Sequence, residues 1–126
     1  MRKRILVVED DISVQKMVGY HLKDNYEVTL VSDGWEAVYK LYNEDPAIDL
    51  ILTDIEMPEL NGLELMEILD ETSGLNQIPV IVMSSLIGEQ ASLDLDFQNY
   101  YGAIPKPIVP TELFLKIEEA FVSKMG

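Results

Sequence analysis

The sequence predicts an α/β fold, a doubly wound sheet of five parallel strands with helices on both faces. Two observations predict it. Short apolar runs rich in β-branched residues recur along the chain, and most are almost continuously apolar, as is typical of parallel strands covered on both faces. Between these runs lie segments whose apolar residues recur at helical spacing. Strand and helix alternate five times, so we expect a (βα)5 order with a parallel sheet.

The strands are predicted from the apolar runs themselves. Four runs are clear and one, the last in the chain, is weaker because it is less apolar. In chain order they are Ile5–Val8, Val28–Val31, Leu50–Thr53, Val80–Met83 and Tyr101–Ile104.

The helices are predicted from apolar stripes with a spacing of three and four residues, and turn or capping residues precede several of them. The stripes are Val14, Met17, Val18, His21 and Leu22; Val38, Leu41 and Tyr42; Leu65, Met66 and Leu69; and Leu113, Ile117, Ala120 and Phe121. The start signals are Asp33-Gly34, Asn61-Gly62 and Pro110-Thr111. Leu93–Phe97 alternates with period two, a strand pattern where the fourth of five helices is expected. Two apolar spacings, Ala91 to Leu95 and Leu93 to Phe97, also fit a helix.

Length and composition limit the possible classes of protein. The 126 residues show no repeat, linker or low-complexity tract, so we expect one domain over residues 1–126. The absence of Cys excludes disulfides and thiolate metal sites. A net charge of −14 repels phosphate backbones, so we expect no direct binding to nucleic acid.

No apolar run approaches the roughly 20 residues that cross a bilayer. The apolar run after the basic start ends at Glu9, too early for a signal peptide, so we expect a soluble, cytoplasmic protein without a membrane partner.

Polar residues that carry chemistry follow several of the predicted strands. In an open parallel sheet the ligand lies outside the carboxyl ends of the strands, so residues at these ends converge on one rim. The residues are Glu9 and Asp10 after the first strand, Asp54 after the third, Ser84 after the fourth and Lys106 after the fifth.

The residue types at this rim favour phosphoryl chemistry. Crowded carboxylates repel one another unless a hard divalent cation neutralises them, and oxygen ligands favour Mg²⁺. A carboxylate such as Asp54 beside that ion can attack phosphorus and form an acyl phosphate. The metal ion, Lys106 and the Ser84 hydroxyl would then meet the charge on the phosphoryl oxygens.

Five motifs, in order and at characteristic spacing, resemble the receiver domains of two-component systems. They are Ile5–Asp11, Leu52–Pro58, Asn61-Gly62, Pro79–Ser85 and Lys106-Pro107, and they span essentially the whole chain. The resemblance implies a flavodoxin-like fold with strand order 2-1-3-4-5. It also implies a phosphoprotein that acts in phosphorelay signal transduction.

The resemblance assigns roles residue by residue. Asp54 matches the phosphoacceptor, and Glu9 and Asp10 match the acidic pair that binds Mg²⁺, with Asp10 as the more direct ligand. The backbone carbonyl of Glu56 would be a further metal ligand. Ser84 matches the switch hydroxyl and Lys106 the active-site lysine, whose bond to the following proline resembles one that is cis in this family. Ser85 is interpreted as a bystander.

The implied function is a switch that a histidine kinase or a histidine phosphotransfer protein phosphorylates and that acts on a downstream protein target. Such a domain transforms no metabolite; it catalyses only its own phosphorylation and dephosphorylation. A stand-alone receiver, a relay intermediate and a piece of a longer regulator all fit the sequence.

Two rival functions are less favoured. A Mg²⁺-dependent phosphatase of the haloacid-dehalogenase type needs a second Asp two residues after its nucleophile, where this chain has Glu56, and its nucleophile follows the first strand. A non-phosphorylated pseudo-receiver used only for binding is disfavoured because Asp10, Asp54 and Lys106 are all present.

The sequence departs from the receiver pattern at Ala103. Receivers usually have Tyr or Phe three residues before the lysine, as the second element of the switch. Tyr100 and Tyr101 lie just upstream, and either could take that place. The output mechanism is therefore open, while the phosphoacceptor chemistry is unaffected.

Overall fold

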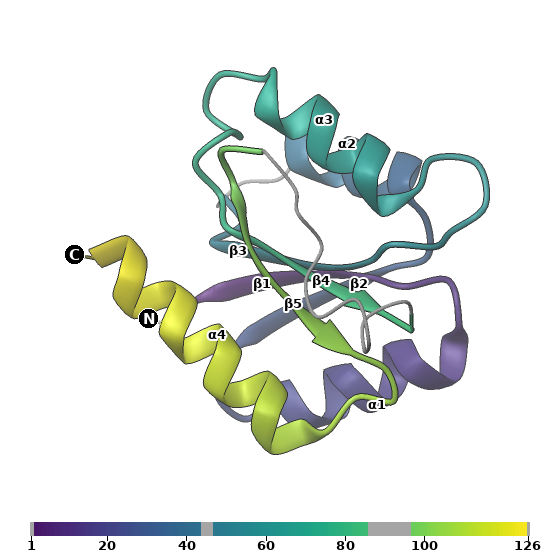
Figure 1. Cartoon of the computed structure of the whole chain (residues 1–126), viewed down its shortest axis with the longest axis vertical. Coiled ribbons are helices and arrows are strands. Elements are labelled where there is room, and N and C mark those ends of the chain that lie inside the picture. The colour runs from purple at the N-terminus through teal and green to yellow at the C-terminus, as the bar shows by residue number, and fades with distance from the viewer. Residues whose placement is uncertain (1, 44–46, 86–96, 126) are drawn as a thin grey trace.

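The structure, a computed structural model, describes residues 2–43, 47–85 and 97–125 and forms a three-layered α/β sandwich (Figure 1). Five strands and four helices lie within these ranges. In chain order they are β1 (Arg4–Val8), α1 (Ile12–Leu22), β2 (Glu27–Val31), α2 (Gly34–Asn43), β3 (Leu50–Asp54), α3 (Gly62–Asp70), β4 (Val80–Ser84), β5 (Tyr100–Pro105) and α4 (Pro110–Met125). Among the helices of this part of the chain, none combines the length and the apolarity that a bilayer crossing requires.

The strands form a single parallel sheet in the order β2-β1-β3-β4-β5. This confirms the predicted fold class and strand order. Each predicted strand is present, and the observed strands extend the predicted runs by one residue at one end or at both. The central strands are apolar on both faces because both faces are covered: every residue of β3 and β4 is buried.

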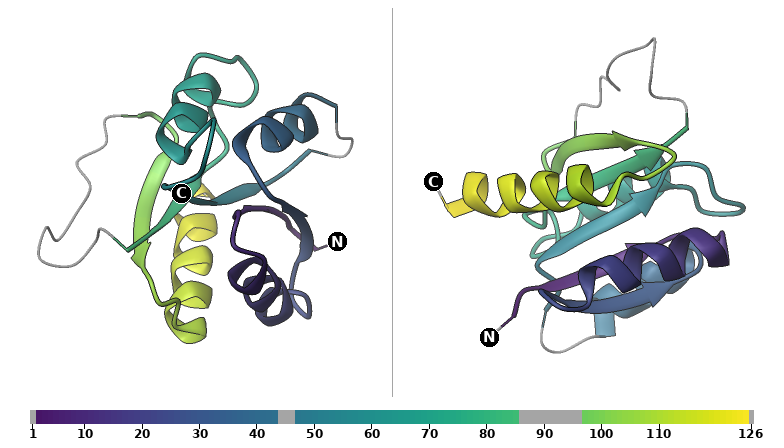
Figure 2. Two further views of the ribbon diagram at one scale, coloured as in Figure 1. Left: turned by 90° about the vertical axis from the view of Figure 1, so that its right-hand side faces the viewer. Right: turned by 90° about the horizontal axis from the view of Figure 1, so that it is seen from below.

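Two apolar layers separate the sheet from its helices. Helices α2 and α3 cover one face, and α1 and α4 cover the other (Figures 1 and 2). Alternate residues along β1 enter the two layers: Leu6 and Val8 pack towards α2 and α3, whereas Ile5 and Val7 pack towards α1 and α4. The strands that end at the rim are therefore packed against helices on both faces of the sheet.

The two helices that follow the site strands begin at well-defined caps. Asp11 caps α1, where its side chain accepts hydrogen bonds from the backbone N–H groups of Ser13 and Val14. Asn61 and Glu64 form a reciprocal capping box at the start of α3. These caps fix where the chain turns away from β1 and β3, and so where the acidic residues between strand and helix must lie.

The predicted helix between β4 and β5 falls largely outside the described residues, which omit 86–96. The period-two pattern of Leu93–Phe97 therefore stays untested. Phe97, its last residue, is described and packs against the apolar layer below α2 and α3.

Strand β5 contains a one-residue register shift, which decides which of the two tyrosines shares a face of the sheet with Ala103. Val80 pairs with Tyr100, but the next residue of β4, Ile81, pairs with Gly102. Tyr100 consequently packs in the same apolar layer as Ala103, and Tyr101 packs in the layer below α1 and α4. Of the two tyrosines, only Tyr100 lies on the face where Ala103 replaces the expected aromatic residue.

Candidate functional site

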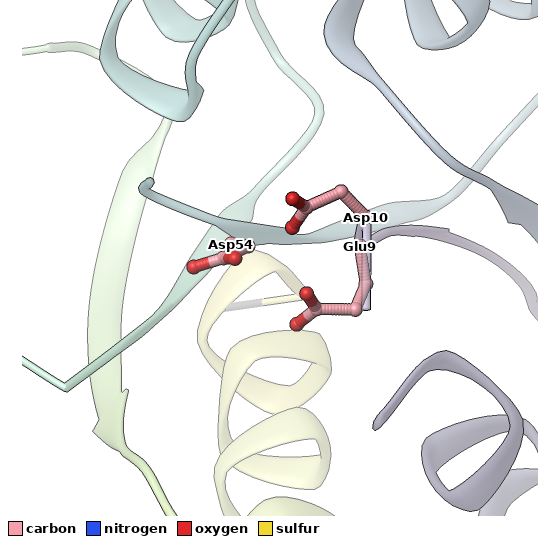
Figure 3. Close-up of side chains that lie close together, drawn as sticks. All are labelled: Glu9, Asp10 and Asp54. Atoms are coloured by element: carbon pink, nitrogen blue, oxygen red, sulfur yellow. The ribbon is translucent and has the colours of Figure 1, made fainter. Parts of the chain in front are cut away.

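Three carboxylates gather at the carboxyl ends of β1 and β3. Glu9 and Asp10 follow β1, and Asp54 is the last residue of β3. One carboxylate oxygen from each lies within 4.8 Å of the others, and the close-up shows the three groups facing one space (Figure 3). Glu9 and Asp54 are buried, whereas Asp10 is exposed. The structure thus brings together the acidic residues that the sequence predicted for one rim.

Lys106 reaches into the same site from the end of β5. Its Nζ atom lies 2.9 Å from Oε1 of Glu9 and 3.2 Å from Oδ2 of Asp54. Its backbone N–H donates a hydrogen bond to the carbonyl oxygen of Ser84 at 3.0 Å, which ties the residue to the end of β4. The peptide bond from Lys106 to Pro107 is cis, as the resemblance implied.

The electrostatics of the site follow from this crowding. Burial raises the pKa of Glu9 to about 7, even though the hydrogen bonds from Lys106 and from the Asp11 N–H act in the opposite direction. Burial alone would lower the pKa of Lys106. The hydrogen bonds and charges of Glu9 and Asp54 outweigh that effect, so the pKa of Lys106 lies above its usual value. Lys106 is therefore a fixed positive charge beside Asp54.

The loop after β3 is tied to the site by hydrogen bonds. The backbone N–H of Glu56 donates to Oδ1 of Asp54 at 3.2 Å, which orients the carboxylate. The Ser85 hydroxyl donates to Oε1 of Glu56 at 3.2 Å, so the side chain of Glu56 bridges to the residue after β4. Ser85, interpreted from the sequence as a bystander, makes a specific contact. Its neighbour Ser84 is fully buried at the end of β4.

A supporting residue that the sequence interpretation missed is Gln15. It is buried, and its Nε2 atom donates to the carbonyl oxygens of Glu9 at 3.1 Å and Val31 at 2.9 Å. Gln15 thereby holds the ends of β1 and β2 together beneath the acidic pair. The available signal was weak: a polar residue next to the apolar stripe of the helix.

The donor set fits a hard divalent cation. Three carboxylates without a neutralising ion repel one another, and Lys106 supplies only one positive charge to them. Oxygen donors from carboxylates and carbonyls are the ligands that Mg²⁺ and Ca²⁺ take. Glu9, Asp10 and Asp54 could therefore hold such an ion between them.

Comparison with known proteins gives a family match over most of the chain. Residues 5–118 match the model of the family described as "Response regulator receiver domain". A "Two-component response regulator-like" protein of Arabidopsis thaliana is 40% identical over 111 residues, which are 87% of this chain and 24% of that protein. The "Probable transcriptional regulator ycf29" of Pyropia yezoensis is 32% identical over 114 residues, which are 90% of this chain and 50% of that protein. The chain thus spans half or less of the length of the first curated relatives that it matches.

Solved structures agree with the family match. The chemotaxis response regulator CheY4 of Vibrio cholerae superposes with a TM-score of 0.85 and 26% identity, over 95% of this chain and 99% of that chain. A CheY-like response regulator receiver domain protein from Methanospirillum hungatei superposes with a TM-score of 0.86 and 27% identity, over 99% of this chain and 98% of that chain.

Proposed function

Because the chain belongs to the response regulator receiver domain family of two-component systems, we propose that Asp54 accepts a phosphoryl group and that this modification switches protein contacts. Receiver domains interact with histidine kinases or histidine phosphotransfer proteins. A partner of one of these two kinds is therefore the proposed donor for this chain. The observation that carries the proposal is the position of Asp54, buried between Glu9, Asp10 and the ammonium of Lys106.

Asp54 acts as the nucleophile. One carboxylate oxygen attacks the phosphorus of a phosphohistidine, an O–P bond forms, the N–P bond breaks, and the released imidazole nitrogen takes up a proton from water. The Glu56 N–H on Oδ1 orients the carboxylate for this attack. Lys106 stabilises the charge that develops on the phosphoryl oxygens, because its ammonium already lies 3.2 Å from Oδ2.

Mg²⁺ is the proposed cofactor, with Glu9, Asp10, Asp54 and the backbone carbonyl of Glu56 as the residues that would hold it. When bound, the ion neutralises the carboxylates and the phosphoryl oxygens, so that nucleophile and donor can approach. The Ser84 hydroxyl is the proposed switch group, which donates to a phosphoryl oxygen once Asp54 is modified.

Hydrolysis returns the chain to its unmodified state. A water molecule attacks the phosphorus, the O–P bond to Asp54 breaks, the carboxylate is restored, and inorganic phosphate and a proton are released. The chain would then catalyse its own phosphorylation and dephosphorylation and transform no metabolite. Its downstream target would be a protein that distinguishes the two states.

The test uses a small phosphoryl donor such as acetyl phosphate with Mg²⁺, followed by intact-protein mass spectrometry. The wild-type chain is expected to gain one phosphoryl group. Asp54→Asn is expected to gain none, and Asp24→Asn, an exposed control, is expected to behave like the wild type. An undiminished mass shift in Asp54→Asn would refute the assignment. Turnover of a generic phosphomonoester such as p-nitrophenyl phosphate would instead support the phosphatase alternative.

A further inference from the structure

Three aromatic side chains form an exposed stripe along α2 that the phosphorylation site does not use. Trp35, Tyr39 and Tyr42 are spaced four and three residues apart, so they share one flank of the helix. Their exposed fractions are 56%, 67% and 57%, whereas Ala37 and Leu41 of the same helix are buried in the core. Large aromatic groups are the side chains most enriched at the centres of protein interfaces. We call these three residues the α2 stripe.

The α2 stripe lies beside the carboxyl end of α3. The hydroxyl of Tyr42 is 3.1 Å from Oγ1 of Thr72, just past α3, and the two helices run side by side on one face of the sheet (Figure 2). Glu67 of α3 and Glu71 at its C-cap are both exposed, and Glu71 directly precedes Thr72. The helix next to the α2 stripe therefore carries exposed acidic side chains.

The charge of this region is strongly one-sided. Residues 33–43 and 61–71 together contain one basic residue, Lys40. They contain six acidic residues, which are Asp33, Glu36, Glu64, Glu67, Asp70 and Glu71. Several of these carboxylates accept hydrogen bonds from backbone N–H groups, but such bonds do not cancel the negative charge. The field over the surface attracts a basic partner.

The same charge argues against a second copy of this chain as the occupant. Each copy carries a net charge of −14, so two copies repel one another as they approach through this acidic face.

Elsewhere in the described chain, aromatic rings are covered by cations: Lys23 lies 4.7 Å from the centroid of Tyr20, and Lys3 lies 5.6 Å from that of Phe121. Arginine is the cation most often found over aromatic rings, and its planar group also pairs with carboxylates.

From these observations we propose that the α2 stripe, with Glu67 and Glu71 of α3, is a docking surface for an arginine-bearing basic segment of another protein. Guanidinium groups stack on Trp35, Tyr39 and Tyr42, and neighbouring basic groups pair with the carboxylates. None of these five residues is among those found around Asp54, so we expect the unphosphorylated chain to bind.

The chain carries its own probe for this proposal, because Trp35 is its single tryptophan. The experiment titrates the unphosphorylated full chain with a blocked helical peptide that has arginine at positions i, i+4 and i+7, and follows tryptophan fluorescence. A second peptide has citrulline, the neutral isostere, at the same positions. The arginine peptide is expected to give a saturable fluorescence change that weakens with salt, and to bind about tenfold more tightly than the citrulline peptide.

Variants assign the binding to the stripe. The pair Tyr39→Ser and Tyr42→Ser keeps Trp35 and is expected to weaken binding about tenfold. Tyr20→Ser removes a similarly exposed tyrosine on α1 and is expected to change binding less than twofold. All three side chains are more than half exposed, so the variants should fold, and thermal melting checks this. Equal binding of both peptides, or equal binding by the Tyr39/Tyr42 variant and the Tyr20 variant, would overturn the proposal. So would a concentration-dependent dimer, detected by sedimentation, that the Tyr39/Tyr42 substitutions dissolve.

Discussion

Glu9 is the residue in which burial and function conflict most directly. Its side chain is fully buried, and its pKa is raised from 4.5 to about 7, chiefly by that burial. Lys106, at 2.9 Å, compensates part of the cost of a buried negative charge. The carboxylate is held in an environment that favours its neutral form until a further cation arrives. A buried carboxylate such as that of Glu9 is expected at the end of a strand where a bound cation supplies the compensating charge.

This conflict predicts a pH-dependent stability in the absence of metal. Between pH 4.5 and about 7 the folded chain keeps the Glu9 proton and the unfolded chain does not, so the free energy of unfolding falls as the pH rises through this range. Relative to Glu9→Gln, the wild type should lose up to about 3 kcal/mol across it. Urea unfolding with a chelator present, at several pH values, measures the difference. Parallel curves for the two proteins would contradict the account of Glu9.

The bond between Ser85 and Glu56 predicts an effect on the lifetime of the phosphorylated state. If Ser85 holds the Glu56 carboxylate where it orients the attacking water, Ser85→Ala should slow loss of phosphate about threefold, since a positioned carboxylate acts as a better base. Glu56→Ala should slow it at least as much, and the double variant should add little. Release of inorganic phosphate after donor removal measures the rates. Additive effects, or faster loss in Ser85→Ala, would show that the bond has no such role.

At the scale of single elements, the loop from β3 to α3 positions the nucleophile by close backbone contact. The N–H of Gly62 donates to the carbonyl oxygen of Ile55 at 3.1 Å, which closes the loop on itself. A Cβ atom at Gly62 would lie 2.4 Å from the backbone oxygen of Asp54 and 3.0 Å from Cα of Ile55. Neither backbone atom can move without shifting the end of β3. Glycine is needed at position 62 because the backbone of Asp54 and Ile55 leaves no space for a Cβ atom.

The predicted consequence is a matched pair of variants. Gly62→Ala should lower the free energy of unfolding by about 2 kcal/mol and reduce the yield of phosphorylated protein, because the clash displaces Asp54. Gly19 lies within α1, and a Cβ atom there would meet only the flexible side chain of Leu30 from β2. Gly19→Ala should therefore be neutral or slightly stabilising. Chemical denaturation and intact mass measure both quantities. A Gly62→Ala chain as stable as Gly19→Ala would rule out the close-contact explanation.

The elements also show where sequence interpretation stops. The continuous apolar runs of β3 and β4 and the cap at Asn61 carried enough local information to predict those elements. The register shift in β5 did not, because Tyr100 and Tyr101 are adjacent aromatic residues and a single inserted pairing position decides which face each occupies. Contacts such as that between Gln15 and Val31 depend on side-chain conformations between distant segments, and no local pattern records them.

At the scale of the whole molecule, the site could be predicted because topology does most of the assembly. A parallel sheet brings the carboxyl ends of β1, β3 and β5 to one edge. Residues far apart in the chain therefore converge once the sheet forms, and no local sequence signal is needed to place each of them. The net charge of −14 adds an electrostatic cost to folding. The carboxylates of Glu9, Asp10 and Asp54 add to this cost because they concentrate negative charge at one point.

That concentration predicts stabilisation by Mg²⁺. An ion that binds only the folded site raises the melting temperature, and the shift should grow with ion concentration at constant ionic strength. Asp10→Asn should remove most of the shift, and because Asp10 is exposed the variant should fold normally. Asp24→Asn, which changes the net charge equally, is the control. Equal shifts in both variants would mean that the ion only screens the surface charge.

The central claim is that Asp54 becomes the acyl phosphate, and the most direct measurement is to locate that bond chemically. Borohydride reduces an acyl phosphate of aspartate to the alcohol homoserine, which peptide mass spectrometry identifies at its position in the chain. After treatment with a small phosphoryl donor and Mg²⁺, the account predicts homoserine at position 54 and at no other aspartate, with none when Mg²⁺ is chelated. Homoserine at Asp10 or another position, or an unreduced Asp54 in a chain that has gained a phosphoryl group, would contradict it.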